Sequence, residues 1–265
     1  MRINIAYCIT QDFIENASVS AASILQNASE KDEYYFYIFT ENFNNNDKTA
    51  FEKITKFHPA KIDFIKINRK IFNPFINNSP IGISPLYRLL IPSLLPNIDK
   101  ILYLDADTYI YSNLAELYNY DITNHFVAGV IDKCEQTMRR RVKLGEGQTF
   151  INAGVLLLNL RAFRENNLEE KCFELLKTTR SFNDQDVINS ICREKILLLP
   201  LKYNIMAYPP EVTQRAESQY ENMEAEAIEA YKNPVIFHMH LKPWNNPYLS
   251  SSHDWIKLWN KLHET

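Results

Sequence analysis

The sequence predicts an α/β protein with a mixed, mostly parallel central β-sheet that is covered by helices on both faces. Short apolar runs alternate with amphipathic segments along the chain, which is the pattern of strands connected by covering helices. Residues 3–9 form an apolar run and residues 18–25 a segment rich in small residues, as in the first strand and helix of a nucleotide-binding βα unit. Because no linker-like stretch divides the 265 residues, we expect one domain over 1–265 that ends in a short helix at about 251–263.

The remaining strands are predicted where a short apolar run is bounded by polar residues, and the remaining helices where apolar residues recur with a helical period. The predicted strands are residues 34–39, 61–66, 101–104, 126–131, 149–158, 196–199 and 234–240. The predicted helices are residues 48–57, 84–92, 161–179 and 221–231, with approximate ends. Residues 201–218 show neither pattern and are expected to be irregular.

Composition narrows the classes of ligand and of cellular location. A formal charge of −3 argues against nucleic acid as the main partner, because a phosphate backbone requires a basic surface. The four cysteines are scattered, which favours reduced thiols over a zinc site or a disulfide framework; they are Cys8, Cys134, Cys172 and Cys192. No apolar run is long enough to span a bilayer and the first residues show no signal-peptide pattern, so we expect a cytoplasmic protein.

The strand predicted at 101–104 leads directly into Asp105 and Asp107. In an open α/β sheet, ligands bind outside the carboxyl ends of the strands, and two carboxylates there can converge on one hard cation that binds phosphate oxygens. This position indicates a metal-dependent nucleotide site. The same spacing also occurs in solvated loops, and it recurs at Asp184-Gln-Asp186, where it precedes an apolar helical pattern and suits the helix dipole.

Two further stretches could approach a ligand. The turn after the first strand, residues 10–13, lacks the glycine-rich fingerprint that cradles phosphates. Its side chains could hold a base and ribose, or Thr10 or Asp12 could cap a helix. Residues 152–154 place small side chains inside a predicted strand, where a glycine usually marks a bulge or a close approach to the backbone.

Arginine residues occur in two predicted helical segments. Ser84 is expected to cap the helix at 84–92, with Pro85 in its first turn, and Arg88 then falls among leucines. Considered alone, this pattern favours a surface arginine over one that points into the neighbouring site. The adjacent Arg139, Arg140 and Arg141 favour a solvated helix face over a loop that closes on a substrate.

The last predicted strand, like the strand before Asp105, has polar groups at its carboxyl end. His238 or His240 there, followed by Lys242 and a stiff Pro-Trp turn, could supply a third metal ligand next to a phosphate-binding cation. This pattern alone leaves both histidines as candidates.

Taken together, these pieces resemble the retaining glycosyltransferases of family 8, which include bacterial lipooligosaccharide galactosyl- and glucosyltransferases and the glycogenins. The matching pieces occur in the family's order and cover nearly the whole chain. They are Tyr87-Arg-Leu89, Leu102-Tyr-Leu-Asp-Ala-Asp107, Phe150-Ile-Asn-Ala-Gly-Val-Leu156, Asn183-Asp-Gln-Asp186, and His238 with Lys242-Pro-Trp244.

The resemblance implies a GT-A fold, a bound Mn²⁺ ion with Mg²⁺ as an alternative, and UDP-galactose or UDP-glucose as the donor. It implies Asp105, Asp107 and His238 as metal ligands, and Lys242 as the ligand of the diphosphate. We favour His238 over His240, because it directly follows the apolar residues 235–237. By the same correspondence, the donor would contact Arg88, Ala106, Asn152, Ala153 and Gly154, while its uracil and ribose would lie against Tyr7, Cys8, Thr10, Asp12 and Phe13. Asp184 and Gln185 would face the anomeric carbon and the acceptor.

The resemblance also implies transfer to a saccharide or glycolipid acceptor in cell-surface glycan synthesis, for which we favour front-face attack over double displacement. The alternative function is a phosphotransferase of the haloacid dehalogenase type with Asp105 as nucleophile, because an apolar strand followed by Asp-x-Asp also resembles that family. A weak peripheral contact with the inner face of the cell membrane would use an apolar face of the terminal helix, although such faces more often lie in the core. This face comprises Trp255, Ile256, Leu258, Trp259 and Leu262.

Overall fold

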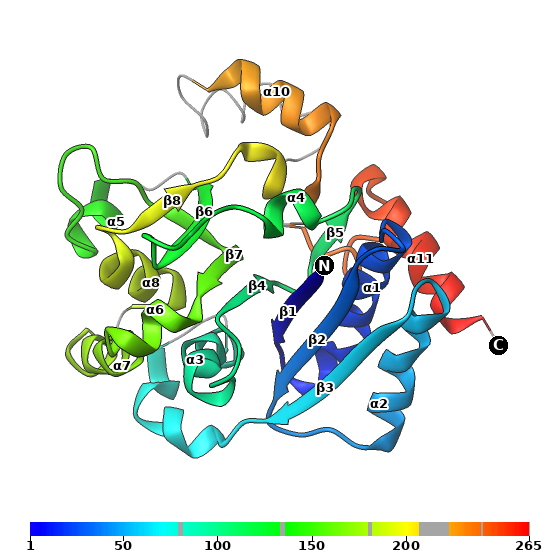
Figure 1. Cartoon of the computed structure of the whole chain (residues 1–265), viewed down its shortest axis with the longest axis horizontal. Coiled ribbons are helices and arrows are strands. Elements are labelled where there is room, and N and C mark those ends of the chain that lie inside the picture. The colour runs from blue at the N-terminus through cyan, green and yellow to red at the C-terminus, as the bar shows by residue number, and fades with distance from the viewer. Residues whose placement is uncertain (79–81, 133–135, 180–181, 207–222, 240, 265) are drawn as a thin grey trace.

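The computed structural model describes residues 1–78, 82–132, 136–179, 182–206, 223–239 and 241–264 (Figure 1). Its centre is a seven-stranded sheet with the strand order β3-β2-β1-β4-β7-β6-β8. The strands are β1 (Arg2–Cys8), β2 (Glu33–Thr40), β3 (Ala60–Lys66), β4 (Lys100–Leu104), β6 (Val127–Ile131), β7 (Ile151–Asn159) and β8 (Ile196–Leu198). All seven lie at or within a few residues of the predicted runs.

The strand directions explain where a ligand can bind. Strands β1 to β4 are parallel, β7 is antiparallel to both β4 and β6, and β8 is parallel to β6. The predicted mixed, mostly parallel sheet is therefore confirmed. From β1 the chain continues toward β2 and β3, whereas β4 lies on the other side of β1, so the strand order reverses between β1 and β4. Such a reversal opens a crevice at the carboxyl ends of the two strands.

Helices cover both faces of the sheet, as predicted. Leu102 and Leu104 of β4 belong to one hydrophobic core, and Ile101 and Tyr103 to the other, because successive side chains of a strand point to opposite faces. The helices are α1 (Ile14–Gln26), α2 (Asn45–Glu52), α3 (Ile91–Leu94), α4 (Ala115–Tyr118), α5 (Gln136–Arg141), α6 (Leu160–Glu165), α7 (Leu168–Thr178), α8 (Asp184–Cys192), α10 (Glu224–Lys232) and α11 (His253–His263). Residues of α1, α10 and α11 pack in the first core and residues of α3, α6, α7 and α8 in the second (Figure 1).

Several short helices have 3₁₀ geometry. They are η1 (Gln11–Phe13), η2 (Lys53–Lys56), η3 (Arg69–Asn78), η4 (Ser84–Leu90), η5 (Leu201–Tyr203) and η6 (Ser250–Ser252). The predicted helix at 84–92 is thus η4 followed by α3, and the predicted Ser84 cap is wrong, since Ile83 occupies the cap position and no side chain caps this helix. The predicted helix at 161–179 is interrupted at Asn167, whose φ of 52° lies in the left-handed region, which asparagine tolerates better than most residues.

The chain beyond β8 departs from the prediction in its details. The last predicted strand is only β9 (Ile236–His238), which pairs antiparallel with β5 (Thr108–Ile110), a short strand that we did not predict. His240, Cys134 and residues 207–222 lie outside the described residues. The predicted helix at 221–231 is described from Glu224 onward as α10.

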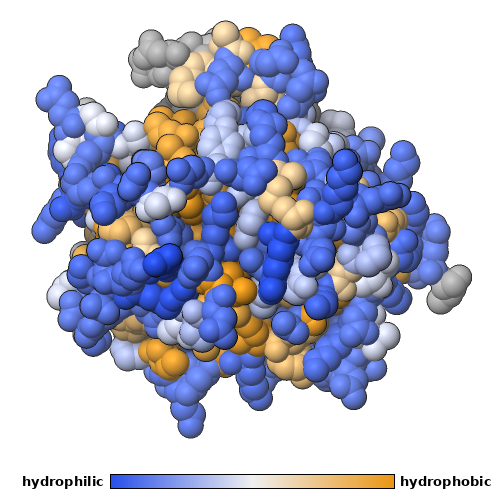
Figure 2. Space-filling view, viewed as in Figure 1, coloured by the Kyte–Doolittle hydropathy of each residue, from blue (hydrophilic) through white to orange (hydrophobic). Residues whose placement is uncertain are grey.

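The apolar face of the terminal helix lies in the core. Trp255, Leu258 and Leu262 are almost fully buried, and α11 packs against α1. The side chains considered for membrane contact are therefore used mainly inside the fold. Among the described residues, no helix is both long and apolar enough to cross a bilayer. Hydrophobic residues appear as small interrupted areas on the face shown in Figure 2, between larger hydrophilic ones.

Candidate functional site

The carboxyl ends of β4 and β9 bring the predicted metal ligands together. Asp105 and Asp107 follow β4, and the antiparallel pairing of β5 with β9 places Thr108 opposite His238. A backbone hydrogen bond of 2.8 Å from Met239 to the carbonyl of Asp107 continues this pairing. One ligand atom from each of Asp105, Asp107 and His238 lies within 4.8 Å of the other two, which is a geometry that could hold a metal ion.

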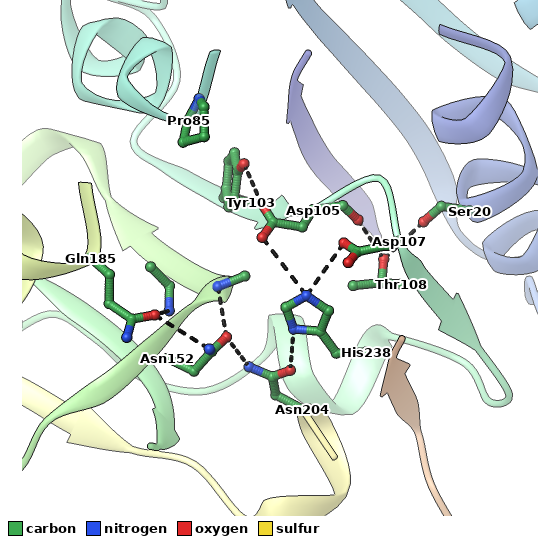
Figure 3. A network of polar contacts seen from close by, with 12 residues as sticks. Ser20, Pro85, Tyr103, Asp105, Asp107, Thr108, Asn152, Gln185, Asn204 and His238 are labelled. Atoms are coloured by element: carbon green, nitrogen blue, oxygen red, sulfur yellow. Dashed lines mark hydrogen bonds and ion pairs between the residues drawn. The ribbon is translucent and has the colours of Figure 1, made fainter. Parts of the chain in front are cut away.

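Each carboxylate has one oxygen that faces the imidazole and one that a different group fixes. In Asp105, Oδ1 accepts hydrogen bonds from the Tyr103 hydroxyl at 2.6 Å and from Arg88 Nη2 at 3.1 Å, while Oδ2 lies 3.8 Å from His238 Nε2. In Asp107, Oδ1 lies 3.3 Å from His238 Nε2, and Lys242 Nζ contacts Oδ2. The imidazole of His238 therefore turns Nε2 toward both carboxylates (Figure 3).

Electrostatics shift the pKa values of this cluster. Burial by itself would raise the pKa of Asp107, but His238 and Lys242 lower it well below its usual range. Burial by itself would lower the pKa of His238, but Asp107 and Asp105 raise it above 6.5. A charged Asp107 is the form that coordinates a cation.

The position of Arg88 differs from the surface position that its helical pattern predicted. It is only 3% exposed, so the predicted surface position is wrong. Its Nη1 pairs with Asp184 at 3.2 Å and also donates to the carbonyl of Ala153, while Nη2 pairs with Asp105. The guanidinium thus connects the carboxyl end of β4, the start of β7 and the start of α8. Burial raises the pKa of Asp184, although Arg88 opposes this shift.

An amide network lies beside the metal cluster. Gln185 Oε1 accepts from the backbone N–H of Ala153 at 2.9 Å and from Asn152 Nδ2 at 3.3 Å, and Gln185 Nε2 donates to Asp132 at 3.1 Å. Asn152 Nδ2 also donates to Asp132 at 3.2 Å. We did not predict Asp132, although it directly follows β6 as Asp105 follows β4, and this position could have indicated it.

The second Asp-x-Asp motif begins a helix, as predicted. The Asn183 side chain accepts from the backbone of Asp186 at 2.8 Å and Asp186 accepts in return at 3.2 Å, which forms a capping box at the start of α8. Asp186 is 1% exposed and pairs through both oxygens with Arg141 Nη2, at 2.8 and 2.7 Å. Arg141 lies on the predicted helix, as the last residue of α5, and its side chain is 34% exposed, so it is partly solvated while its guanidinium reaches a buried acid.

The first βα turn lies at the other side of the crevice. The side chain of Tyr7 is fully buried and bonds to Ser20, so only its backbone could meet a nucleotide, and Cys8 is also buried. Thr10 occupies the cap position before η1, but its side chain makes no capping hydrogen bond, so Thr10 is not a helix cap of the predicted kind. Asp12 is exposed, and Phe13 is 39% exposed and packs edge-on against Trp244 at 5.6 Å between centroids, beside the Lys242 segment.

Asn204 is a neighbour of the site that sequence reasoning missed. It lies in the segment that we predicted to be irregular, immediately after η5, and it is 1% exposed. Its amide contacts both Asn152 and His238 (Figure 3). No local pattern could indicate this residue, because both partners are distant in the sequence.

A family model for glycosyl transferase family 8 matches residues 4–247. The chain belongs to this family. Among similar proteins, the lipopolysaccharide 1,3-galactosyltransferase of Salmonella typhimurium is 28% identical over 77% of this chain and 63% of its own length. A lipopolysaccharide 1,2-glucosyltransferase of Escherichia coli is 24% identical over 95% of this chain and 74% of its own length, and general stress protein A of Bacillus subtilis is 22% identical over 92% and 88%.

Solved structures show the same GT-A fold. The galactosyltransferase LgtC, in complex with donor and acceptor sugar analogues, superimposes with a TM-score of 0.83 at 20% identity, over 100% of this chain and 97% of that chain. The bifunctional glycosyltransferase WbbM gives 0.83 at 19% identity, over 97% of this chain and 49% of that chain. The family match does not favour the haloacid dehalogenase alternative.

Proposed function

We propose that this glycosyltransferase is a retaining hexosyltransferase that moves galactose or glucose from a UDP-sugar to a saccharide or glycolipid acceptor and requires Mn²⁺. The observation that carries the proposal is the cluster of Asp105, Asp107 and His238 with Lys242 beside it. Three protein ligands leave coordination positions for phosphate oxygens. Two carboxylates and an imidazole suit Mn²⁺ better than Mg²⁺, which prefers oxygen ligands in octahedral geometry.

The leaving group explains why cations gather here. Cleavage of the sugar–phosphate bond expels a UDP anion, and a bound metal ion would supply charge stabilisation for its phosphates. Lys242, whose side chain is 44% exposed, would release Asp107 to bind the diphosphate and stabilise the same charge. Arg88, Ala106 and residues 152–154 would contact the donor sugar and its phosphates, and Asp184 with Gln185 would orient the acceptor.

We favour front-face attack as the route to retention. Double displacement would need a carboxylate directly beneath the anomeric carbon to act as nucleophile. Both acids at the start of α8 are already engaged, Asp184 by Arg88 and Asp186 by Arg141. In front-face attack, the departing phosphate oxygen accepts the proton of the acceptor hydroxyl, while Asp184 and Gln185 stabilise the positive sugar. The pairing of the two acids supports this second route.

The nucleoside would lie across the switch point of the sheet. The contact between Phe13 and Trp244 brings the first βα turn next to the Lys242 segment, so one ligand could reach both. The uracil and ribose would then contact the backbone of Tyr7 and Cys8 and the side chains of Thr10, Asp12 and Phe13.

The acceptor is proposed from the relatives. Two of them are named as lipopolysaccharide galactosyl- or glucosyltransferases, which supports a saccharide of a cell-surface glycan as acceptor. Such a reaction would take place in the cytoplasm, with weak contact to the inner face of the membrane. The three buried residues of the α11 face do not supply that contact.

A donor-hydrolysis assay tests the proposal. With Mn²⁺, the protein should release UDP from UDP-galactose or UDP-glucose, faster when a saccharide acceptor is present, and Asp107→Ala should abolish the release. Phosphate release from a generic phosphate ester without UDP formation would overturn the proposal in favour of the phosphotransferase. If Asp107→Ala and Gln185→Ala both left ligand affinity and turnover unchanged, the protein would instead be a sugar-binding module.

A further inference from the structure

Asn204 is held against His238 by the main chain around both residues. The backbone N–H of Val235 donates to the carbonyl of Lys202 at 2.9 Å, and that of Ile205 donates to Ile236 at 3.1 Å. The N–H of His238 in turn donates to the carbonyl of Ile205 at 3.1 Å. The segment that carries Asn204 thus runs alongside β9, and its side chain has little freedom to leave His238.

The orientation of each amide follows from one backbone N–H group. The N–H of Gly154 donates to the Asn152 side chain at 2.8 Å, so the atom that it meets must be the oxygen, Oδ1. Asn152 Nδ2 then faces the carboxylate of Asp132, which can only accept when it is ionised. Reversal of this amide would set two donors against each other at one end and two acceptors at the other.

The same reasoning extends to Asn204 and His238. Asn152 Oδ1 also contacts the Asn204 amide at 2.8 Å, and an oxygen can only be met by the donor, Nδ2. Asn204 Oδ1 therefore faces His238 Nδ1, at 3.1 Å. Because this oxygen can only accept, Nδ1 must carry a proton and donate it. Nε2 faces the carboxylates of Asp105 and Asp107, so it is the nitrogen at which a bound cation would replace a proton (Figure 3).

We propose that Asn204 is a positioning residue for the metal site, which holds the proton on Nδ1 of His238 so that the Nε2 lone pair faces the cation. This inference rests on the proposed metal role of His238. Groups that fix the second nitrogen of a metal-binding histidine set the tautomer and the ring orientation. Here hydrogen bonds connect the backbone N–H of Gly154 to His238 through Asn152 and Asn204. The start of β7 therefore determines which nitrogen of His238 binds the cation.

The variants Asn204→Ala and Asn204→Asp test the proposal separately from a general loss of stability. Alanine removes the acceptor for Nδ1–H, and we expect the affinity for Mn²⁺ to fall about 10- to 100-fold, as for other groups that support metal ligands. Aspartate keeps an acceptor oxygen for Nδ1–H but loses the amide group that donates to Asn152, so it should regain only part of that affinity. The affinity is measured with Mn²⁺ alone, from the EPR signal of the free ion.

Asn159→Ala is the matched control. Asn159 is also a buried asparagine whose side chain both accepts and donates hydrogen bonds. It caps α6 and donates to the carbonyls of Ile122 and His125. It lies at the other end of β7, away from the cluster. We expect this variant to lower the melting temperature without a change in Mn²⁺ affinity.

A second readout follows the imidazole itself. In the Mg²⁺-loaded native protein and in Asn204→Asp, the Nδ1–H proton of His238 should give a slowly exchanging NMR signal. In Asn204→Ala it should exchange rapidly with water.

The outcomes separate this inference from the proposed function. Native-like Mn²⁺ affinity in Asn204→Ala, or failure of Asn204→Asp to regain affinity over alanine, would overturn the role of Asn204 and leave the metal site intact. If the native protein bound no Mn²⁺, or bound it equally well without Asp107, the metal site would fail and the inference with it. Should the alanine variant not fold, the native protein still decides the question, because a His238 Nδ1–H proton that exchanges rapidly there would overturn the role of Asn204.

Discussion

The backbone of Gly154 lies directly against the imidazole of His238. A methyl group on Gly154 would come within 2.2 Å of Cε1 and 2.7 Å of Nδ1 of that ring, and within 2.9 Å of Oδ2 of Asp105. The sequence pattern predicted a bulge or a ligand at this glycine. Both features occur: the pairing of β6 with β7 shifts register across residues 152–155, and a protein side chain rather than a ligand makes the close approach. The absence of a Cβ atom allows two metal-ligand candidates to meet.

Gly154→Ala should therefore disturb the cluster. The ring of His238 is held from behind by Asn204, so it cannot retreat without loss of its position toward the carboxylates. We expect Mn²⁺ affinity to fall by about tenfold or more, in the range found when the support of a metal ligand is lost. Isothermal titration with Mn²⁺ measures this change. Gly145→Ala is the control, since its added methyl group would make only an ordinary contact of 3.6 Å with Gln148, and equal affinities of the two variants would contradict the prediction.

Removal of divalent metal should abolish turnover. If the cluster of Asp105, Asp107 and His238 binds the cation that holds the diphosphate, excess chelator should stop UDP release from a UDP-sugar, and added Mn²⁺ should restore it. The assay measures UDP at a fixed donor concentration. Full activity in excess chelator would show that the cluster has another role.

Lys242→Met should lower kcat strongly and leave the stability of the fold nearly unchanged. The ammonium group pairs with Asp107, and in the proposed reaction it stabilises charge on the departing phosphate. We expect kcat to fall about 100-fold, comparable with the loss of one charge-stabilising donor in other enzymes. Lys202→Met is the control, because Lys202 pairs with the exposed Glu116 on the surface. A rate within twofold of native for Lys242→Met would remove the lysine from the mechanism.

Arg88→Met should destabilise the fold. The buried guanidinium pairs with Asp105 and with Asp184, and loss of one partner of a buried pair costs about 3–5 kcal/mol because the other charge stays unpaired. Urea denaturation measures the loss. Arg161→Met, which breaks an exposed pair with Glu165, should cause little change.

The stability loss in Arg88→Met should also depend on pH. Burial raises the pKa of Asp184 and Arg88 opposes that shift, so the variant should have a still higher pKa in the folded state. A raised pKa means that the folded state binds the proton more tightly than the unfolded chain. The deficit relative to native should therefore be largest at neutral pH and shrink as the pH falls toward about 4. A deficit that stays constant or grows on acidification would contradict this account.

Local patterns in the sequence determined much of the architecture. Two examples depend only on neighbours in the chain: the apolar run of β4 that ends at Asp105 and Asp107, and the acidic residues 184–186 before the helical pattern of α8. Such signals can be read because backbone hydrogen bonding and burial on a strand or a helix have fixed periods. The polar end of the last predicted strand indicated His238 or His240 and Lys242, and the resemblance to a family chose His238 and gave both residues their roles.

Only the tertiary structure decided the roles of Arg88, Asn204 and Asp132. The helical pattern around Arg88 is the same whether the arginine faces water or a buried carboxylate, since the pattern does not specify what packs against that face. Asn204 and Asp132 acquire their roles through hydrogen bonds to residues of β7 that lie 52 and 20 positions away in the chain. These contacts exist because β7 runs antiparallel to β4 and carries Asn152 to the same edge as Asp105, and strand order and direction are properties of the packed sheet rather than of any one segment.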